Sequence, residues 1–246
     1  MYRTLNAERI VATLVTLQRR VGDRFPRSGL TGVCGDVVEL AKQTTGRIAE
    51  VGRPHWALRF GVIVTVVLGV AGLALVIGRA VELKGTDELS DVMQGLDSAV
   101  NLTVILGGAA FFLSTIETRW KRNKALTALH ELRSIVHVID MHQLTKDPSM
   151  LGGARTSSSP DHDLTPFELM RYLDYCSELL SLTAKLAALY AEKLSDPVVV
   201  DTVGDIERLT SGLSSKIWQK ITIVQSLEGR ELPPAIPPPV FKPSPV

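Results

Sequence analysis

The sequence predicts an all-α membrane protein, in which a hairpin of two transmembrane helices is joined to a cytoplasmic bundle of long amphipathic helices. Three observations predict this fold. Two apolar runs, 60–78 and 99–116, have about the length that crosses a bilayer. Basic side chains flank the pair on one side, whereas acidic side chains gather between the runs. The rest of the chain repeats apolar residues at three- and four-residue spacing, as helices do.

The composition excludes some classes of function. The chain has 246 residues with 27 basic and 26 acidic side chains, so it has no net field to attract nucleic acid, and we expect no nucleic-acid partner. Aromatic residues make up 5% of the chain, which suits layered helices better than sheets. Cys34 and Cys176 both fall within helical patterns, where we expect them to pack as small apolar residues.

The segment 1–55 is predicted to form two cytoplasmic helices. Pro26 and Gly29 separate them, and Gly52 with Pro54 ends the second. Each helix carries an apolar stripe: Ile10, Leu14, Leu17 and Val21 on the first, and Val37, Leu40, Thr44 and Ile48 on the second.

The segment 56–120 is predicted to contain the membrane hairpin. The run 60–78 holds about 19 residues without a charge, close to the length of one membrane span. The run 99–116 is shorter and contains Asn101 and Thr103, so by itself it also fits a buried soluble helix. A single span would leave its small residues without a packing partner, and we therefore expect both runs to cross the membrane.

Flanking charges predict the orientation of the hairpin. Arg53 and Arg59 precede the first run, and four basic side chains follow the second within 119–124. The segment 80–98 holds five acidic side chains and one lysine. The positive-inside rule therefore places the 80–98 loop outside and both termini in the cytoplasm, with Trp56 and Trp120 at the cytoplasmic interface. We expect a multi-pass protein of the plasma membrane, specifically a bacterial inner membrane.

Small residues at four-residue spacing predict where the two spans approach each other. They are Gly61, Thr65 and Gly69 on the first run, with Gly78 beyond them, and Thr103 and Gly107 on the second. Two interpretations stay open: these residues pack the hairpin on itself, or some of them also join neighbouring subunits.

No helix breaker follows the second run, so we expect one helix from about residue 99 to 145, roughly 70 Å long. Beyond residue 124 its apolar residues alternate four- and three-residue spacing, the narrow pattern of a coiled coil. A second copy of the chain would cover such a seam along its whole length. The sequence thus predicts a homo-oligomer with a contact at Leu129, Leu132, Val136 and Ile139.

The segment 121–229 is predicted to complete the bundle with an antiparallel helix pair. Thr165, followed by a proline and then by Glu168, has the pattern of a capping box at a helix start. A second helix follows the short turn at Pro197. Their stripes are Leu169, Leu173, Cys176, Leu180, Thr183, Ala187, Tyr190 and Leu194, and then Val199, Val203, Ile206, Thr210, Leu213, Ile217 and Val224.

Two segments are predicted to lack regular structure. The loop 147–164 is rich in Gly, Ser and Pro. The tail 230–246 is rich in proline and favours polyproline II. The tail is either a disordered end or a ligand for the aromatic groove of a protein partner.

No motif for catalysis or cofactor binding stands out. His130 and His137 share a helical face, but two turns separate them by about 10.5 Å, and the residues between them are not metal ligands. We expect no metal, no cofactor and no enzymatic activity. Basic side chains on the last two helices could bind an anion, although such residues are usually just solvated: Arg171, Lys185, Arg208, Lys216 and Lys220.

In layout, a two-span hairpin with a cytoplasmic helical bundle is similar to the two-transmembrane effector modules of bacterial nucleotide-signalled defence systems. That resemblance implies an oligomeric effector that perturbs the membrane or forms a pore. The architecture favours a different function, a non-enzymatic scaffold or signalling component whose bundle self-associates and binds a partner or ligand. A pore would need a polar stripe through both spans. An enzyme, the third alternative, would need a polar cluster inside the bundle.

Overall fold

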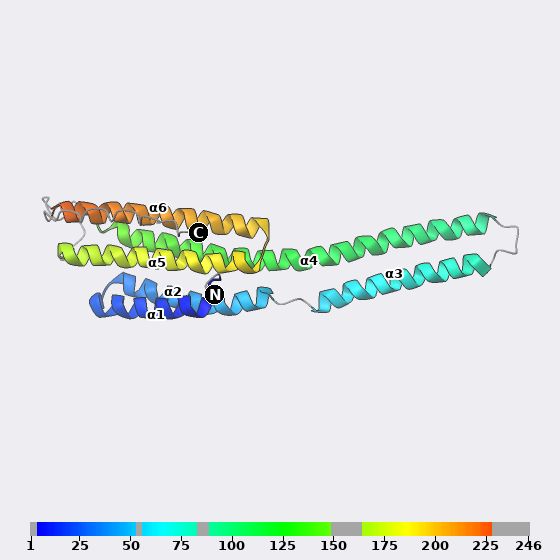
Figure 1. Ribbon diagram of the computed structural model, residues 1–246, viewed down its shortest axis with the longest axis horizontal. Helices are drawn as coiled ribbons and strands as arrows, with labels where there is room; N and C mark the ends of the chain where they lie inside the picture. Colours follow the sequence, from blue (N-terminus) through cyan, green and yellow to red (C-terminus); the bar gives the residue numbers. More distant parts are fainter. Residues whose placement is uncertain (1–3, 53–55, 83–88, 149–163, 228–246) are drawn as a thin grey trace, which may run out of the picture. The chain divides into compact units, whose positions relative to one another are not determined.

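The computed structural model describes residues 4–52, 56–82, 89–148 and 164–227 (Figure 1). These residues form helices without a strand among them, which confirms the predicted all-α class. The helices are α1 (Ala7–Arg24), α2 (Gly29–Gly52), α3 (Trp56–Glu82), α4 (Leu89–Leu144), α5 (Pro166–Lys193) and α6 (Pro197–Leu227). The tail 230–246 and most of the loop 147–164 lie outside the described residues.

Helix α4 is continuous through 121–124, as its lack of a breaker predicted, and is 56 residues long. It begins at Leu89, about ten residues before the expected start, so residues 89–98 of the predicted outer loop are helical. The reason is local, since this stretch holds one glycine and no proline and the backbone continues its helical hydrogen bonds through it.

The chain divides into two compact units. The first, which we call the bundle, comprises 1–45, 129–189 and 201–246, and the second, which we call the apolar unit, comprises 46–128 and 190–200. Helix α4 contributes to both, because its residues before Leu129 belong to the apolar unit and the rest to the bundle.

The predicted stripes form the buried surface of the helices. All four stripe residues of α1 are at most 6% exposed, and every stripe residue of α5 and α6 is buried. In α2 the stripe is shifted, because Ala41 is buried where Leu40 is half-buried. Val33, Cys34 and Val38 are also buried, so α2 presents a broader face than the sequence suggested.

Lys220 of α6 caps the carboxyl end of α4 inside the bundle. Its Nζ donates to the backbone oxygen and to the Oε1 of Gln143, both at 2.8 Å. The Gln143 side chain is buried and donates to Asp140 Oδ1 at 2.6 Å. Burial lowers the pKa of Lys220, against the nearby carboxylates of Asp147 and Asp140. The last carbonyls of a helix lack intrahelical donors and favour a cation, so this contact joins α6 to α4.

The capping box predicted at the start of α5 is present. The backbone N–H of Glu168 donates to Thr165 Oγ1 at 3.2 Å, and the backbone N–H of Thr165 donates to Glu168 Oε2 at 2.9 Å. The Thr165 hydroxyl also donates to Glu168 Oε2, at 2.8 Å. The backbone N–H and then the hydroxyl of Thr165 hold the pKa of the Glu168 carboxyl below its usual value. The sequence therefore sets the first residue of α5 locally.

Replacing Thr165 with alanine removes half of this capping box, and we expect it to lower the free energy of unfolding by about 1 kcal/mol. Thermal unfolding of the full-length chain in mild detergent, followed by circular dichroism, measures the loss. Ser215→Ala is the matched control, because the Ser215 hydroxyl donates to the Ser211 carbonyl in the middle of α6 and caps no helix end. Equal melting temperatures for Thr165→Ala and the wild type would contradict the assigned cap.

Candidate functional site

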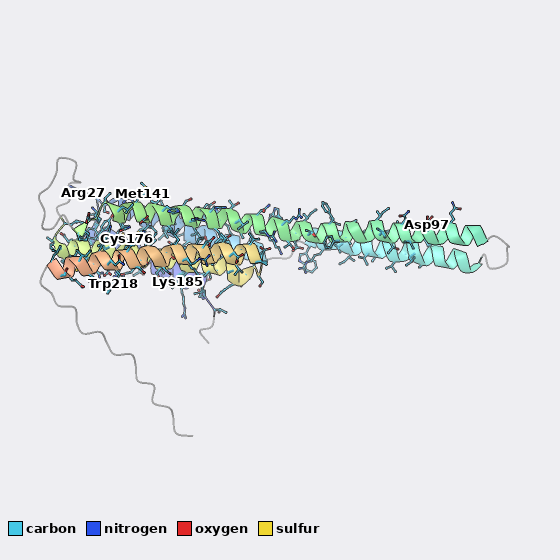
Figure 2. The ribbon with its side chains drawn as sticks, turned by 90° about the horizontal axis from the view of Figure 1, so that it is seen from above. Arg27, Asp97, Met141, Cys176, Lys185 and Trp218 are labelled. Atoms are coloured by element: carbon cyan, nitrogen blue, oxygen red, sulfur yellow. The ribbon has the colours of Figure 1, made fainter. Side chains whose placement is uncertain are left out.

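Large apolar side chains of α3 and of the first part of α4 face outward (Figure 2). Phe60, Val70 and Leu75 of α3 are 64–70% exposed, and Phe111 and Phe112 of α4 are 74% and 63% exposed. Soluble proteins seldom expose a continuous apolar surface of this extent to water. The apolar unit therefore has the surface of a protein that contacts a partner or a lipid phase.

One described helix is long and apolar enough to cross a membrane. It is the stretch Val100–Leu144 of α4, and none of its most apolar window, with a mean hydropathy of 1.6, is buried. The apolar stretch of α3 among described side chains, Arg59–Leu75, is shorter than this criterion requires. Length and composition thus support one span, and the second span stays a prediction.

Leucine side chains of α4 lie over glycines of α3. A Cβ atom added to Gly69 would lie 3.1 Å from Leu106 Cδ1, and one added to Gly72 would lie 3.2 Å from Leu102 Cδ2. These distances are shorter than ordinary van der Waals contacts, so a larger residue at either glycine would push the two helices apart. The prediction named Gly69 but missed Gly72, because it followed four-residue spacing and residues three apart share a helix face as well.

Small residues on both helices line a pocket of about 180 Å³ in the apolar unit. Its walls include Thr65, Gly69 and Leu73 of α3 and Thr103, Gly107 and Ala110 of α4. Four of the six predicted packing residues therefore meet at one place. Of the other two, Gly61 lies against Leu113, where a Cβ would be 3.8 Å from Cδ1, and a Cβ at Gly78 would meet nothing within 4 Å.

Charged side chains border the apolar stretch at one end. Glu117 and Lys121 form an ion pair of 2.7 Å with side chains only 15% and 16% exposed. Arg59 Nε of α3 lies 3.8 Å from the same Glu117 carboxylate. Lys124 pairs with Glu50, and its Nζ lies 5.1 Å from the centroid of the Trp120 ring.

Asp196, also in the apolar unit, links helix α4 to the start of α6. Arg122 donates to its Oδ2 from Nε at 2.8 Å and from a terminal nitrogen at 2.7 Å, while the N–H groups of Val198 and Val199 donate to its Oδ1. It is therefore both the N-cap of α6 and the ion-pair partner of α4. The bond from Arg122, with help from these N–H groups, holds the pKa of Asp196 below its usual value against the opposing effect of burial.

The structure corrects the premise of the predicted oligomer contact. Leu129, Leu132, Val136 and Ile139 are fully buried within the bundle of a single chain. Their narrow spacing fits a neighbouring copy and an intramolecular core equally well, and the chain's own helices supply the cover. The homo-oligomer itself stays a prediction, but these four residues are not a surface on which to build it.

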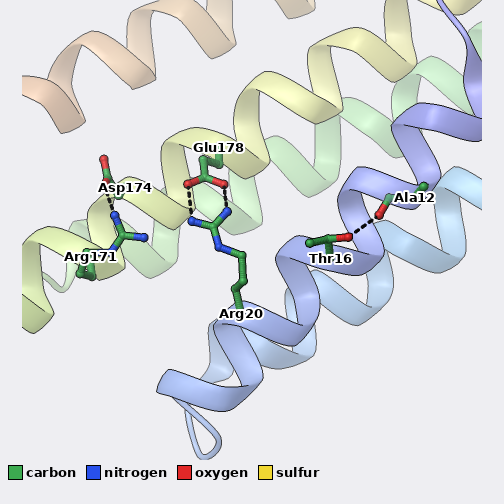
Figure 3. A network of polar contacts seen from close by, with 6 residues as sticks. All are labelled: Ala12, Thr16, Arg20, Arg171, Asp174 and Glu178. Atoms are coloured by element: carbon green, nitrogen blue, oxygen red, sulfur yellow. Dashed lines mark hydrogen bonds and ion pairs between the residues drawn. The ribbon is translucent and has the colours of Figure 1, made fainter.

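A second candidate site lies in the bundle, where Arg20 of α1 and Arg171 of α5 each pair with a carboxylate of α5 (Figure 3). The guanidinium carbons of Arg20 and Arg171 lie 5.2 and 4.9 Å from the Tyr175 ring centroid. Arg20 donates to both oxygens of Glu178, at 2.8 and 3.3 Å, and Arg171 pairs with Asp174 at 2.8 Å. The sequence offered no signal for the pairing of Arg20 with Glu178, which are 158 residues apart.

The arginines around Tyr175 are balanced by carboxylates. Arg20, Arg171 and Tyr175 line a recess of about 450 Å³, whose other walls are Arg24 and Asp23. Burial raises the pKa of Tyr175, but hydrogen bonds and positive charge from the arginines outweigh it and lower the pKa below the usual value. An added anion would have to displace these carboxylates. Other basic residues weighed as anion ligands also have partners: Lys185 has Ser181, Arg208 has Asp205 and Lys220 has Gln143.

No protein-family model matches this chain, and neither the curated proteins nor the solved structures contain a match to it.

Asp196→Ala removes a helix cap and a charged hydrogen-bond partner, so we expect it to cost about 2 to 3 kcal/mol of stability. Asp196→Asn keeps a capping oxygen and should cost less. Because the folded pKa of Asp196 is lowered, its charge stabilises the fold above the unfolded pKa, and this contribution disappears as the pH falls through the folded value. Thermal unfolding in detergent should therefore show that the difference in melting temperature between the wild type and Asp196→Asn becomes smaller as the pH is lowered. A gap that is constant with pH would contradict the role of the charge.

Proposed function

We propose that this chain is a non-enzymatic integral membrane protein. In this proposal α3 and the first part of α4 cross the bilayer as a hairpin, and the bundle lies in the cytoplasm as a scaffold or signalling module. The outward-facing apolar surface of the hairpin carries the proposal, because lipid tails would cover side chains that are 60% exposed or more in the isolated chain. Helices satisfy their own backbone hydrogen bonds, which is what the hydrocarbon phase demands.

The charged border supports the orientation. Arg59, Lys121 and Lys124 gather at one end of the apolar stretch together with Trp56 and Trp120, which are 75% and 44% exposed. Basic residues are favoured on the cytoplasmic side of a membrane, and exposed tryptophan rings favour its interface. This end of the hairpin therefore faces the cytoplasm.

A pore has less support than a scaffold. A conducting path needs polar side chains along both helices. The polar residues of the predicted spans 60–78 and 99–116 are few: Thr65, Asn101, Thr103, Ser114 and Thr115. Of these, Thr65 and Thr103 line the pocket between the helices.

Self-association has a candidate surface on the opposite face of α4 from the buried seam. An exposed stripe there keeps the same three- and four-residue spacing and consists of His130, Ser134, His137 and Met141, with Leu144 at its end. Met141, labelled in Figure 2, lies on this stripe. Met141 is 67% exposed and Leu144 is 60% exposed. Membrane-anchored copies would present α4 in parallel, so identical stripes, which hold no Lys, Arg, Asp or Glu, would face each other.

Thiol labelling in intact cells tests the membrane topology. We expect cysteine at Asp97 to react with an impermeant reagent, whereas cysteine at Ser215 should react only after lysis. The native Cys34 and Cys176 should stay silent, because burial raises the pKa of each thiol to about 12 and leaves almost no thiolate. Reversed labelling would overturn the orientation, and recovery of the chain outside the membrane fraction would overturn the membrane proposal.

Two introduced glutamates test whether the exposed stripe of α4 is a contact between copies of the chain. Ser134→Glu with Met141→Glu should dissociate the oligomer and leave the fold intact, since both side chains are exposed and like charges would meet across the contact. Light scattering of the detergent-solubilised chain measures the mass. Ser215→Glu with Gln219→Glu adds the same charge to an exposed face of α6 and should change nothing. A wild type with the mass of one chain at all concentrations would contradict self-association.

A further inference from the structure

We propose that the apolar unit binds one phospholipid with an anionic headgroup. An acyl chain occupies the pocket between α3 and α4, and the headgroup phosphate contacts Arg59 and Lys121. This inference rests on the proposed membrane location of the hairpin.

The pocket has the size and lining for part of an acyl chain. Its volume is about 180 Å³, and an apolar cavity of about 150 Å³ is enough to hold a benzene-sized molecule. Glycines create the space: Gly69 and Gly107 both line it, and a Cβ at Gly107 would meet nothing within 4 Å. Thr65, the polar residue on the α3 wall, donates its hydroxyl to the Gly61 carbonyl at 2.9 Å, so its donor is already satisfied within α3.

The charged residues lie on the same helix faces as the pocket. Arg59 precedes the lining residue Val66 by seven positions, and Glu117 follows the lining residue Ala110 by seven, so each pair shares a face two turns apart. Lys121 follows Ala110 by three turns. The charges therefore stand about 10 to 16 Å along the helices from the pocket, within the reach of one lipid leaflet, which is half of a hydrocarbon core about 30 Å thick.

The charge balance selects an anionic headgroup. Arg59 and Lys121 carry two positive charges against the single carboxylate of Glu117, which leaves one positive charge at this place. Glu117 forms an ion pair with each of the two cations and so holds them in place. The Arg59 side chain is 57% exposed, and its two terminal nitrogens have the geometry that binds a phosphate. A second copy of the chain fits less well, because in a two-fold contact its own Arg59 and Lys121 would oppose these cations.

Native mass spectrometry of the full-length chain in mild detergent provides the test, with phosphatidylglycerol and phosphatidylcholine of identical acyl chains as probes. The wild type should retain phosphatidylglycerol more strongly than phosphatidylcholine. Gly107→Leu fills the pocket and should reduce the retention of both lipids about tenfold. Gly108→Leu is the matched control, because its Cβ also meets nothing within 4 Å but the residue does not line the pocket, and it should retain lipid as the wild type does.

A second pair of variants tests the headgroup contact. Arg59→Gln with Lys121→Gln should abolish the preference for phosphatidylglycerol, about a tenfold change for the loss of charged hydrogen bonds. Arg119→Gln with Arg133→Gln removes the same charge from exposed positions of α4 and should preserve the preference.

Two results would overturn the lipid site. One is Gly107→Leu retaining phosphatidylglycerol as the wild type does. The other is Gly107→Leu changing the mass of the protein complex without loss of lipid, which would show that a second copy fills the pocket. Cysteine labelling separates these results from a failure of the membrane proposal, because a chain that labels as expected but shows no lipid preference contradicts this inference alone.

Discussion

The unbroken backbone of α4 is the constraint on which both units depend. Its 56 residues run from Leu89 to Leu144 without an interruption, so one helix must suit the different surroundings of two units. Up to about Phe112 its large apolar side chains face outward. From Ala125 onward apolar residues at three- and four-residue spacing are buried, as at Leu129 and Leu132, while the opposite face of the helix is exposed. This inversion follows the solvent that each stretch contacts, lipid in the proposed arrangement and water beyond it.

Helices α3 and α4 approach each other closely because α3 has glycines, which carry no side chain, at the points of contact. Lipid tails are as apolar as leucine, so helices in a membrane gain little from burying leucine and rely on packing at small residues. Gly69 and Gly72 admit Leu106 and Leu102, which is the packing that the proposed membrane hairpin would need, whereas a Cβ at Gly107 would meet nothing within 4 Å. The small residues therefore have two roles: some allow a close contact between the helices, and others leave room for a pocket with a mainly apolar lining.

In the bundle, polar contacts specify the arrangement that the apolar stripes leave undefined. Lys220 bonds to Gln143 across 77 residues of sequence, and Arg20 bonds to Glu178 across 158. Apolar stripes alone tolerate sliding and rotation of one helix on another, because burial is non-directional. A charged group with two specific acceptors fixes one register, since an incorrect register would leave the buried Gln143 without its partner.

The sequence by itself determined the helices, their buried faces and the apolar runs, because caps, breakers and periodicity act within a few residues. Thr165 and Glu168 begin α5 as their spacing requires, and the stripes of α1, α5 and α6 are buried as predicted. Tertiary structure alone decided what covers each face. The seam at Leu132 and Val136 is a pattern that a second copy or the chain's own helices would satisfy equally, and the choice depends on helices distant in sequence. The partners of Arg20 and Arg122 are also beyond sequence reasoning, since they lie 158 and 74 residues away and no local periodicity links them.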